Sequence, residues 1–406
     1  MSNATKVLVT GGAGFIGSHT VDLLLQKGYA VRILDSLQPR VHPRGKPAWV
    51  PTEAEFIQGD VADRETLSRA MRGVEAVMHL AAYQDYMPDF SLFIHSNAES
   101  AALVFELIVA DPKAFPVRKI VFASSQAVCG EGRFFCSRCA WGAAAPSLRE
   151  QLRSPRTAYP KDGRGVLVPS PRPLGQLKSA DWEIRCPVCG DPADPLLIDE
   201  TTVSPGTAYG ISKYAIELLA KRLGKRYGIA TACMRYTYVQ GPRNSIYNAY
   251  SGIARRFALQ LLHGIPPTVY EDGKQMRDYV NVRDVARANV LALEDERADG
   301  EVYNVGGGRA VSVLEFAEIM TKETGSSLEP RVEGEFRLGD TRHTISDISK
   351  LRALGWEPAI PVERNVAEYV AWLREQSASR EYFEEAERLM RRHGVVQRSR
   401  QRVGSA

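Results

Sequence analysis

The sequence lacks the features that mark membrane and nucleic-acid-binding proteins. No apolar stretch approaches the roughly 18–20 residues that a helix needs to span a bilayer. The N-terminus leads straight into a strand pattern, so we expect no signal peptide. Charge of one sign is scarce, because 52 Lys and Arg against 48 Asp and Glu leave a net charge of +4 on 406 residues. So small a charge gives no reason to expect a nucleic acid or a membrane as partner.

Cysteine is scarce as well, with six residues in the chain. This number is too small for a disulfide scaffold, and we expect a reducing cytoplasm as the location. Four of the six form two tight pairs, Cys136 with Cys139 and Cys186 with Cys189. Two CxxC pairs offer four thiolates at the spacing of a tetrahedral zinc site. With four sulfur ligands such a zinc has no open position and is structural; a redox dithiol and unliganded cysteines are the alternatives.

What the sequence does contain begins at residues 6–17, KVLVTGGAGFIG. A short aliphatic run predicts a buried strand, and an apolar helical pattern follows three spaced glycines. Gly11 permits a tight turn, Gly14 lets the backbone approach a pyrophosphate, and Gly17 lets the helix pack close to the strand. The helix N-terminus, with Phe15 and Ile16, then faces the phosphates of a dinucleotide.

Further candidate cofactor residues follow the next strands. Asp35 ends the second strand about 20 residues after the glycines, where a carboxylate accepts both ribose hydroxyls and repels a 2′-phosphate. This favours NAD over NADP. Asp60 and Val61 end the third strand, near the adenine. The stretch Leu80, Ala81 and Ala82 ends the fourth, where small residues let the backbone pass close to a cofactor.

Strands and helices alternate up to Ser124 and Ser125, which predicts an α/β fold with a doubly wound parallel sheet. Tyr209 and Lys213 lie four residues apart, on one face of a predicted helix. A phenol has a reference pKa of about 10. We expect the neighbouring ammonium and a positively charged nicotinamide to lower the pKa of Tyr209. We expect Lys213 also to hold the cofactor ribose, and Ser125 to hydrogen-bond the reacting oxygen.

These motifs resemble those of the extended short-chain dehydrogenase/reductase superfamily, specifically its nucleotide-sugar epimerases and dehydratases. The residues that carry the resemblance are Thr10–Gly17, Asp35, Gly59-Asp60, His79–Ala82, Ser124-Ser125, Tyr209, Lys213, Gly241-Pro242, Arg277-Asp278 and Tyr303–Gly306. The resemblance implies a Rossmann domain, a smaller C-terminal lobe for a nucleoside diphosphate sugar, tightly held NAD and a homodimer packed through helices.

The resemblance also implies further site residues. Asn97 corresponds to the family's cofactor-contacting asparagine, and Arg277 and Arg337 correspond to arginines that grip the diphosphate. Tyr238 replaces an asparagine that usually helps to hold the substrate. The substrate-binding set implied is Ser125, Gln126, Tyr238, Arg277, Arg337 and Asp340.

We expect four parts in the chain. Residues 1–132, 199–242 and 269–300 form the NAD-binding Rossmann domain, and residues 133–198 form a zinc-ribbon-like insert that is rich in Pro, Gly, Arg and Ser. Residues 243–268 and 301–375 form the nucleotide-sugar lobe. Residues 376–406 form a helical and basic tail, solvated in its last dozen residues.

The reaction is inferred from two positions. Dehydratases of the family carry acids just after the catalytic serine or threonine, where this chain has Gln126 and Ala127. That favours 4-epimerisation by transient oxidation at C4 and return of the hydride to either face. The run Gly130–Arg133 and the paired cysteines resemble members assigned to dTDP-L-rhamnose 4-epimerisation. A 4-keto reductase, a dehydratase and a catalytically silent NAD-binding scaffold are the alternatives.

Overall fold

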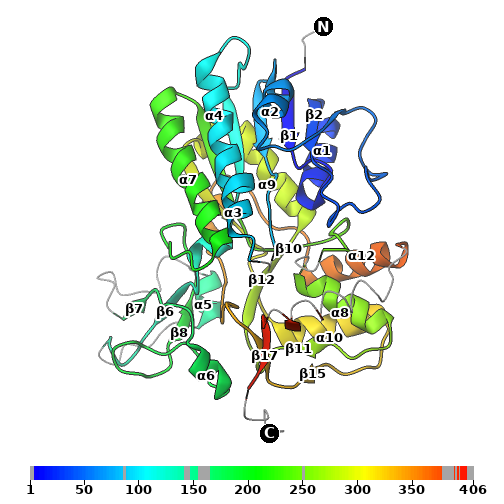
Figure 1. Cartoon of the computed structure of the whole chain (residues 1–406). Helices are drawn as coiled ribbons and strands as arrows, with labels where there is room; N and C mark the ends of the chain where they lie inside the picture. Colours follow the sequence, from blue (N-terminus) through cyan, green and yellow to red (C-terminus); the bar gives the residue numbers. More distant parts are fainter. Residues whose placement is uncertain are drawn as a thin grey trace.

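The structure is a computed structural model of the whole chain. It describes residues 4–85, 88–140, 147–153, 165–248, 252–376, 388, 391–392 and 394–399. A sheet with helices on both faces occupies one half of the molecule, and a smaller lobe and a cysteine-bearing insert occupy the other (Figure 1).

Seven parallel strands form the main sheet in the order β13-β9-β5-β4-β1-β2-β3. Their bounds are Lys6–Thr10 (β1), Ala30–Asp35 (β2), Glu55–Gln58 (β3), Ala76–His79 (β4), Lys119–Ser125 (β5), Ala230–Tyr236 (β9) and Glu301–Val305 (β13). The central strands are aliphatic runs that are buried on both faces, as parallel sheets require. The strand order reverses between β1 and β4, which leaves a crevice at the carboxyl ends of the strands. The predicted doubly wound sheet is confirmed.

Helices cover both faces of this sheet. On one face lie α1 (Phe15–Gln26) and α9 (Val282–Glu294), and on the other lie α2 (Arg64–Met71), α4 (Ser100–Ala110) and α7 (Ala208–Tyr227). Asp63 caps α2 by accepting a hydrogen bond from the Thr66 backbone N–H at 2.8 Å. Thr207 caps α7 in the same way through the Gly210 N–H at 3.0 Å. Each side-chain cap fixes where its helix begins.

In the described part of the chain, one helical stretch is long and apolar enough to cross a membrane by length and composition. It runs from Phe90 to Ala110 through α3 (Phe90–Phe93), a π-helical segment (Ile94–Glu99) and α4, with a mean hydropathy of 1.4 in its most apolar window. Polar residues such as His95 and Asn97 interrupt it, so no continuous apolar run marks it in the sequence. Of that window 56% is buried, which matches a core helix that packs on a sheet.

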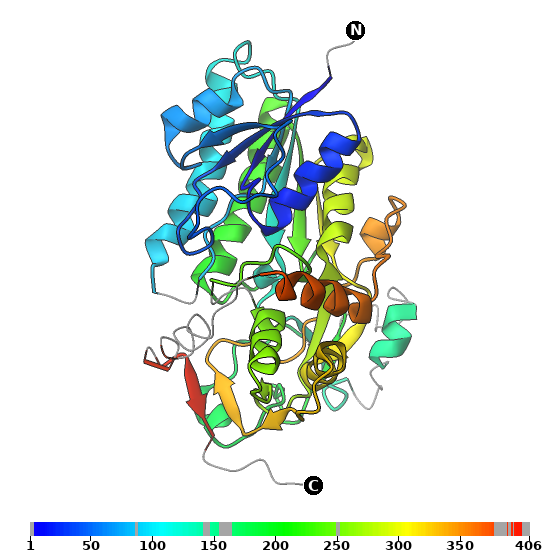
Figure 2. The same ribbon diagram turned by 90° about the vertical axis from the view of Figure 1, so that its right-hand side faces the viewer.

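The smaller lobe is built around a three-stranded sheet of β10 (Tyr238–Gln240), β12 (Met276–Asn281) and β14 (Ala310–Ser312). Its own apolar core packs between α8 (Gly252–Leu262), α10 (Val313–Thr324) and α12 (Val362–Arg374). Two further strand pairs lie at its edge, β11 (Thr268–Val269) with β15 (Arg331–Val332) and β16 (Glu335–Arg337) with β17 (Val396–Arg398). Figure 2 shows this lobe stacked below the main sheet.

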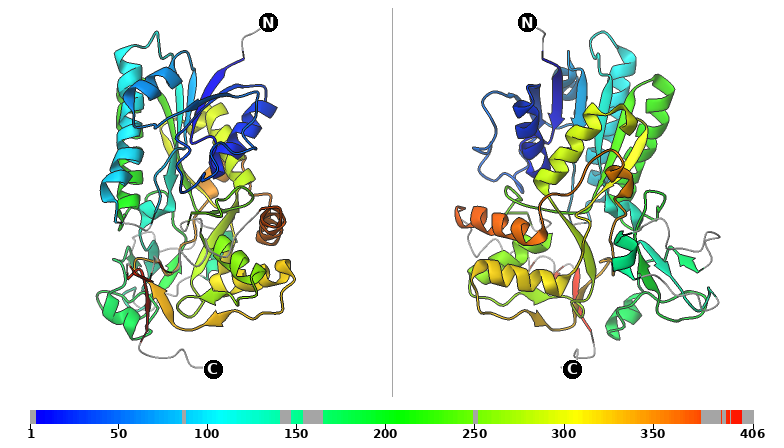
Figure 3. Two further views of the ribbon diagram at one scale, coloured as in Figure 1. Left: turned by 45° about the vertical axis from the view of Figure 1, so that its right-hand side comes forward. Right: turned by 180° about the vertical axis from the view of Figure 1, so that it is seen from behind.

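The insert is a small antiparallel sheet of β6 (Arg133–Phe135), β7 (Val166–Leu167) and β8 (Asp194–Leu196) with two short helices, α5 (Leu148–Arg153) and α6 (Leu174–Lys178). Phe134, Ile184 and Ala193 form its core. The insert lies beside the lobe, on the side away from α12 (Figure 3). Three short helices outside the insert are Gln126–Cys129 (η2), Glu296–Ala298 (η4) and Ser349–Arg352 (α11).

Three predicted boundaries differ from the structure. β13, assigned from sequence to the lobe, pairs with β9 at the edge of the main sheet, and β12, assigned to the Rossmann domain, belongs to the lobe sheet. The expectation that the last dozen residues form a solvated tail is wrong for 396–398, because β17 pairs with β16 and Val396 is buried. Most of the predicted helix before it lies outside the described residues. Only a tertiary partner reveals such short strands, which carry no periodicity.

Candidate active site

A cavity of about 880 Å³ opens at the carboxyl ends of the main-sheet strands and extends to the lobe. Every predicted cofactor residue except Asn97 lines it: Gly11, Gly14, Phe15, Ile16, Gly17, Asp35, Asp60, Val61, Leu80, Ala81, Ala82 and Lys213. The predicted substrate residues line it as well: Ser125, Gln126, Tyr238, Arg277, Arg337 and Asp340. In open α/β sheets, ligands bind at the carboxyl ends of the strands.

The glycine turn is shaped by close backbone approach. Gly11 has a φ of +69°, and a Cβ there would lie 2.9 Å from the Ala81 backbone nitrogen. A Cβ on Gly17 would lie 2.1 Å from the Gly11 carbonyl oxygen. These positions exclude any side chain. The N–H groups of Gly11, Ala13 and Gly14 donate within the protein, and the start of α1 lies at the cavity, where Phe15 and Ile16 line it. Such a cradle fits the pyrophosphate of a dinucleotide.

Asp35 is held in place by two backbone donors. Its Oδ2 accepts a hydrogen bond from the Ala13 N–H at 3.0 Å, and its Oδ1 accepts one from the Leu37 N–H at 2.9 Å. Each carboxylate oxygen keeps a further lone pair. The carboxylate faces the cavity at the end of β2, so it fits a ribose diol and disfavours a phosphate in the same place.

Asn97 is the exception among the predicted cofactor residues. It is fully buried on the π-helical segment, and its amide is used within the protein. Its Oδ1 accepts from the Tyr83 N–H at 2.8 Å, and its Nδ2 donates to the Tyr83 carbonyl at 3.1 Å and to Ser212 Oγ at 2.9 Å. Asn97 therefore ties the loop after β4 to α7, and lies behind the cavity wall.

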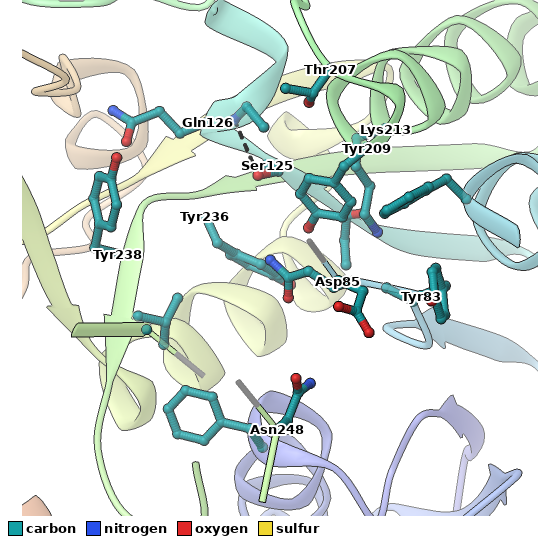
Figure 4. Close-up of a pocket in the computed structure, with 18 of the residues that line it drawn as sticks. Tyr83, Asp85, Ser125, Gln126, Thr207, Tyr209, Lys213, Tyr236, Tyr238 and Asn248 are labelled. Atoms are coloured by element: carbon teal, nitrogen blue, oxygen red, sulfur yellow. Dashed lines mark hydrogen bonds between the residues drawn. The ribbon is translucent and has the colours of Figure 1, made fainter. Parts of the chain in front are cut away.

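Ser125, Tyr209 and Lys213 come together on one side of the cavity (Figure 4). Helix α7 can approach the end of β5 because it carries Gly210, where a Cβ would lie 2.5 Å from the Ala127 carbonyl oxygen. Ser125 Oγ accepts a hydrogen bond from the Ala127 N–H at 3.1 Å. Lys213 Nζ donates to the Ala123 carbonyl at 2.9 Å and lies 5.9 Å from the centre of the Tyr209 ring.

The protein groups alone do not lower the pKa of Tyr209 as the sequence led us to expect. Burial raises the pKa of Tyr209 to about 12, and its hydrogen bond with Ser125 opposes that rise. Burial also lowers the pKa of Lys213 to about 7, so at neutral pH this amine is only partly protonated. The phenolate therefore needs positive charge from a bound group, which an oxidised nicotinamide supplies.

The opposite wall carries the substrate candidates. Gln126 faces Tyr238 in Figure 4, and its Nε2 donates to Ser346 Oγ at 3.0 Å. Gln126 is 6% exposed, and its Oε1 has no hydrogen-bond partner among the described residues. The hydroxyl groups of Tyr238 and Thr344 form a hydrogen bond of 3.2 Å in which either can be the donor. The Arg277 guanidinium lies 5.2 Å from the centre of the Tyr238 ring. A buried amide oxygen without a partner suits a sugar hydroxyl.

The two predicted arginines differ in how they are held. Arg277 is buried and donates to the backbone carbonyls of Met276, Thr341 and Arg342 at 2.7–3.0 Å. Arg337 pairs with Asp340 at 3.0 Å, where both remain partly exposed to the cavity. The sequence-based prediction missed many of the lining residues, among them Glu131, Arg256 and Tyr270. Of these three, only Glu131 had a signal, its place in the Gly130–Arg133 run.

The four paired cysteines gather at one end of the insert. Their Sγ atoms all lie within 4.8 Å of one another, with Cys136 and Cys189 at 3.5 Å and Cys139 and Cys186 at 3.6 Å. Sulfurs held at about 2.3 Å by a tetrahedral zinc are separated by about 3.8 Å, so this geometry fits the metal. The cysteines do not line the cavity, which matches a structural site.

Comparison with known proteins agrees with this geometry. The family model described as "NAD dependent epimerase/dehydratase family" matches residues 7–159 and 186–306. A dTDP-L-rhamnose 4-epimerase from Burkholderia thailandensis is 30% identical over 378 residues, which cover 91% of this chain and 95% of the relative. A putative UDP-glucose 4-epimerase from Methanocaldococcus jannaschii is 29% identical over 91% of this chain and 98% of its own length.

Solved structures show the same relationship. A UDP-glucose 4-epimerase from Thermotoga maritima, solved with UDP-glucose, superimposes with a TM-score of 0.69 and 27% identity, covering 91% of this chain and 99% of that one. A UDP-glucose 4-epimerase from Thermus thermophilus, in complex with NAD, gives a TM-score of 0.66 at 27% identity, with the same coverage. The chain therefore belongs to the NAD-dependent epimerase/dehydratase family, as its motifs indicated.

Proposed function

We propose that this protein is an NAD-dependent nucleotide-sugar 4-epimerase, and that dTDP-L-rhamnose is the first substrate to test. The observation that carries the proposal is the position of Ser125 and Tyr209. They stand where the glycine-turn half of the cavity meets the half lined by Gln126, Tyr238 and Arg277. A sugar bound between the two halves would lie between the Tyr209 phenol and a dinucleotide held by the glycine turn.

The chain's own residues supply binding, orientation and proton transfer. Gly11, Gly14 and Gly17 hold the pyrophosphate of the dinucleotide, and Asp35 holds its adenosine ribose. When bound, NAD supplies the hydride acceptor and donor for the sugar carbon. Tyr209 takes the proton of the C4 hydroxyl as general base and later returns it as general acid, while Ser125 holds the same oxygen. Arg277 and Arg337 anchor the diphosphate while the 4-keto sugar rotates and presents its other face to the hydride donor.

Two features favour epimerisation over the alternatives. Gln126 and Ala127 leave no acid beside Ser125 to remove a proton from a neighbouring carbon, as dehydration requires. Asp35 at the ribose position disfavours NADPH, the usual reductant of a 4-keto reductase. A catalytically silent NAD-binding scaffold would not require Ser125, Tyr209 and Lys213 to lie together in the cavity.

The test is incubation with a panel of dTDP- and UDP-sugars, followed by NMR for inversion at C4. Turnover of dTDP-L-rhamnose to its C4 epimer without added cofactor supports the proposal together with tightly held NAD. Activity on UDP-hexoses alone would remove the dTDP-6-deoxyhexose but keep the epimerase. Loss of a water molecule from the sugar, or a strict need for added NADPH, would contradict epimerisation.

We also propose that Cys136, Cys139, Cys186 and Cys189 hold one structural zinc ion. Metal analysis of freshly purified protein should find one zinc per chain, and Cys139→Ser should lose it, whereas the buried Cys233→Ser should keep it. A zinc content well below one per chain contradicts the proposal.

We also propose that the protein is a homodimer that packs through helices. Apolar side chains are exposed on adjacent helices: Phe90 (65%) and Ile94 (45%) near the start of the Phe90–Ala110 stretch, and Ile211 (50%) and Leu218 (42%) on α7. Light scattering should give twice the mass of one chain, and Ile211→Glu should halve it.

A further inference from the structure

A network of buried charged side chains joins the insert to the lobe. We propose that Arg172, just before α6 of the insert, is a positioning residue for the turn Arg337–Asp340 of the nucleotide-sugar site. The insert then helps to position the residues that bind the substrate, in addition to carrying the four paired cysteines. The inference rests on the proposed function, because it assigns that turn to the nucleoside diphosphate.

Arg172 makes contacts that a free-standing module would not need. Its side chain is 2% exposed, and its guanidinium donates to Glu271 Oε1 at 2.8 Å and Oε2 at 3.0 Å. It also donates to the Asp340 carbonyl at 2.8 Å and to the Trp182 carbonyl of the insert at 2.9 Å. A planar fork with these four acceptors fixes both lobe segments relative to the insert.

Both segments held by Arg172 form the cavity wall. Asp340 pairs with Arg337, and Glu271 follows Tyr270, whose ring lies 4.1 Å from the Arg256 guanidinium and 6.0 Å from that of Arg337. Glu271 has a φ of +54°, a left-handed conformation that a non-glycine residue adopts only when its surroundings hold it there. The two-pronged bond from Arg172 is such a restraint, so removing it releases Tyr270 and the Arg337 turn together.

A second arginine, which belongs to the lobe, binds a carboxylate of the insert. Arg342 of the lobe is fully buried and donates to Glu183 of the insert at 2.6 Å, and to Glu271 and Asp272 of the lobe at 3.0 and 2.7 Å. Its backbone N–H donates to Glu131 at 2.9 Å. Glu131 and Pro171 line the cavity, so the wall of the sugar pocket includes residues whose positions depend on this interface.

Buried ion pairs fix geometry because neither partner can exchange its bond for water. Displacement of the Arg337 turn would lengthen the charge-assisted hydrogen bonds that its guanidinium makes to a diphosphate, and the affinity for the nucleotide sugar would fall with them. The effect belongs to substrate binding and not to the cofactor, because the side-chain hydrogen bonds of Arg172 within the described part of the chain go to Trp182, Glu271 and Asp340 and not to the glycine turn.

The experiment compares Arg172→Met, Arg172→Lys and the control Arg185→Met in the holoenzyme. Arg185 also lies in the insert but makes an exposed ion pair with Asp181. We expect Arg172→Met to raise KM for the nucleotide sugar, and Kd for dTDP in calorimetry, by about tenfold or more, with kcat within about threefold. Arg172→Lys keeps the charge without the fork and should fall between. Bound NAD and zinc per chain, and the kinetics of Arg185→Met, should stay unchanged.

A merely structural role for Arg172 would lower the melting temperature and the active fraction, hence kcat, and leave KM and the dTDP affinity as they are; that outcome overturns the inference. If Arg172→Met does not fold, Arg172→Lys and the double variant Arg172→Met/Glu271→Gln give the same comparison. If the unmodified protein turns over no nucleotide sugar, the proposed function fails, yet dTDP and UDP titrations still test the inference. If it binds neither nucleotide, both are overturned.

Discussion

The cofactor half of the cavity is shaped by backbone packed against backbone, whereas the substrate half is shaped by buried charged side chains. In the first, Gly11 and Gly17 leave no room for a Cβ beside β4 and the glycine turn. In the second, Arg172, Arg277 and Arg342 are buried and donate to carboxylates and carbonyls that lie far away in the sequence. One half depends on the absence of side chains, and the other on matched pairs of them. The two halves should therefore fail in different ways.

Tyr209→Phe should have the largest effect, because Tyr209 stands where the halves meet. Removing the phenol oxygen removes proton transfer and should lower kcat by about 10²–10⁴-fold while NAD and the nucleotide sugar still bind. NMR of C4 inversion measures the loss. Tyr227→Phe, an exposed position on the same helix, is the control. A Tyr209→Phe enzyme that keeps a tenth of the wild-type kcat would contradict the assigned role.

Gly17→Ala should break the cofactor half alone. The added Cβ would meet the Gly11 carbonyl at 2.1 Å, and we expect about 2–3 kcal/mol less free energy of unfolding together with loss of bound NAD. Urea unfolding and the NAD content after purification measure both. Gly175→Ala, in the insert, has nothing within 4 Å of its new Cβ and should retain both properties. Loss of dTDP affinity in Gly17→Ala would show that the halves are not independent.

Acid should weaken the cofactor half through a buried neutral histidine. His79 lies between Thr10 and Ser100, and burial lowers its pKa from 6.5 to about 3. At pH values between these two pKa values, His79 is protonated in the unfolded chain and neutral in the folded protein. The free energy of unfolding therefore falls as the pH falls. The expected slope is about 1.4 kcal/mol per pH unit from this group.

His79→Gln should flatten that slope between pH 6.5 and 4.5, as urea unfolding at several pH values can measure. The exposed His95→Gln should leave it unchanged. Parallel slopes for His79→Gln and wild type would show that His79 is protonated in the folded protein.

Val396→Ala should give the smallest effect, confined to the edge of the substrate half. Val396 lies in β17, opposite Arg337 of β16, and packs against Tyr270. Loss of two buried methyl groups should cost about 1 kcal/mol of stability and raise KM a few-fold, with bound NAD unchanged. Steady-state kinetics with the epimerised sugar measure the shift. An unchanged KM would separate β17 from the site.

This contrast also explains which parts could be predicted from the sequence. The glycine turn, Asp35 and the Tyr209/Lys213 pair each occupy a short stretch with fixed spacing, and all of them line the cavity. Each CxxC pair is equally local, and the meeting of the two pairs, which lie 47 residues apart, is predicted from the ligand set of a tetrahedral zinc site. Local spacing is enough where the chemistry is carried by neighbouring residues.

The features that escaped prediction depend on partners distant in the chain. Nothing near Arg172 indicates that Glu271 lies 99 residues away as its partner, and nothing in β13 or β17 reveals which strand it pairs with. The prediction of a lowered pKa for Tyr209 counts the Lys213 ammonium and a nicotinamide but leaves out burial, which raises this pKa to about 12 in the protein alone. Ion pairs, strand pairing and desolvation are settled by tertiary contacts, which a single sequence does not display.

The two ends of the insert lie side by side, because β6 pairs with β8 so that Arg133 stands opposite Leu196. A segment that leaves and re-enters a host at one point can be transplanted without stretching the host. The ends of the insert therefore put no constraint on its length, and its place beside the sugar pocket is set by the ion pairs of Arg172 and Glu183 with the lobe.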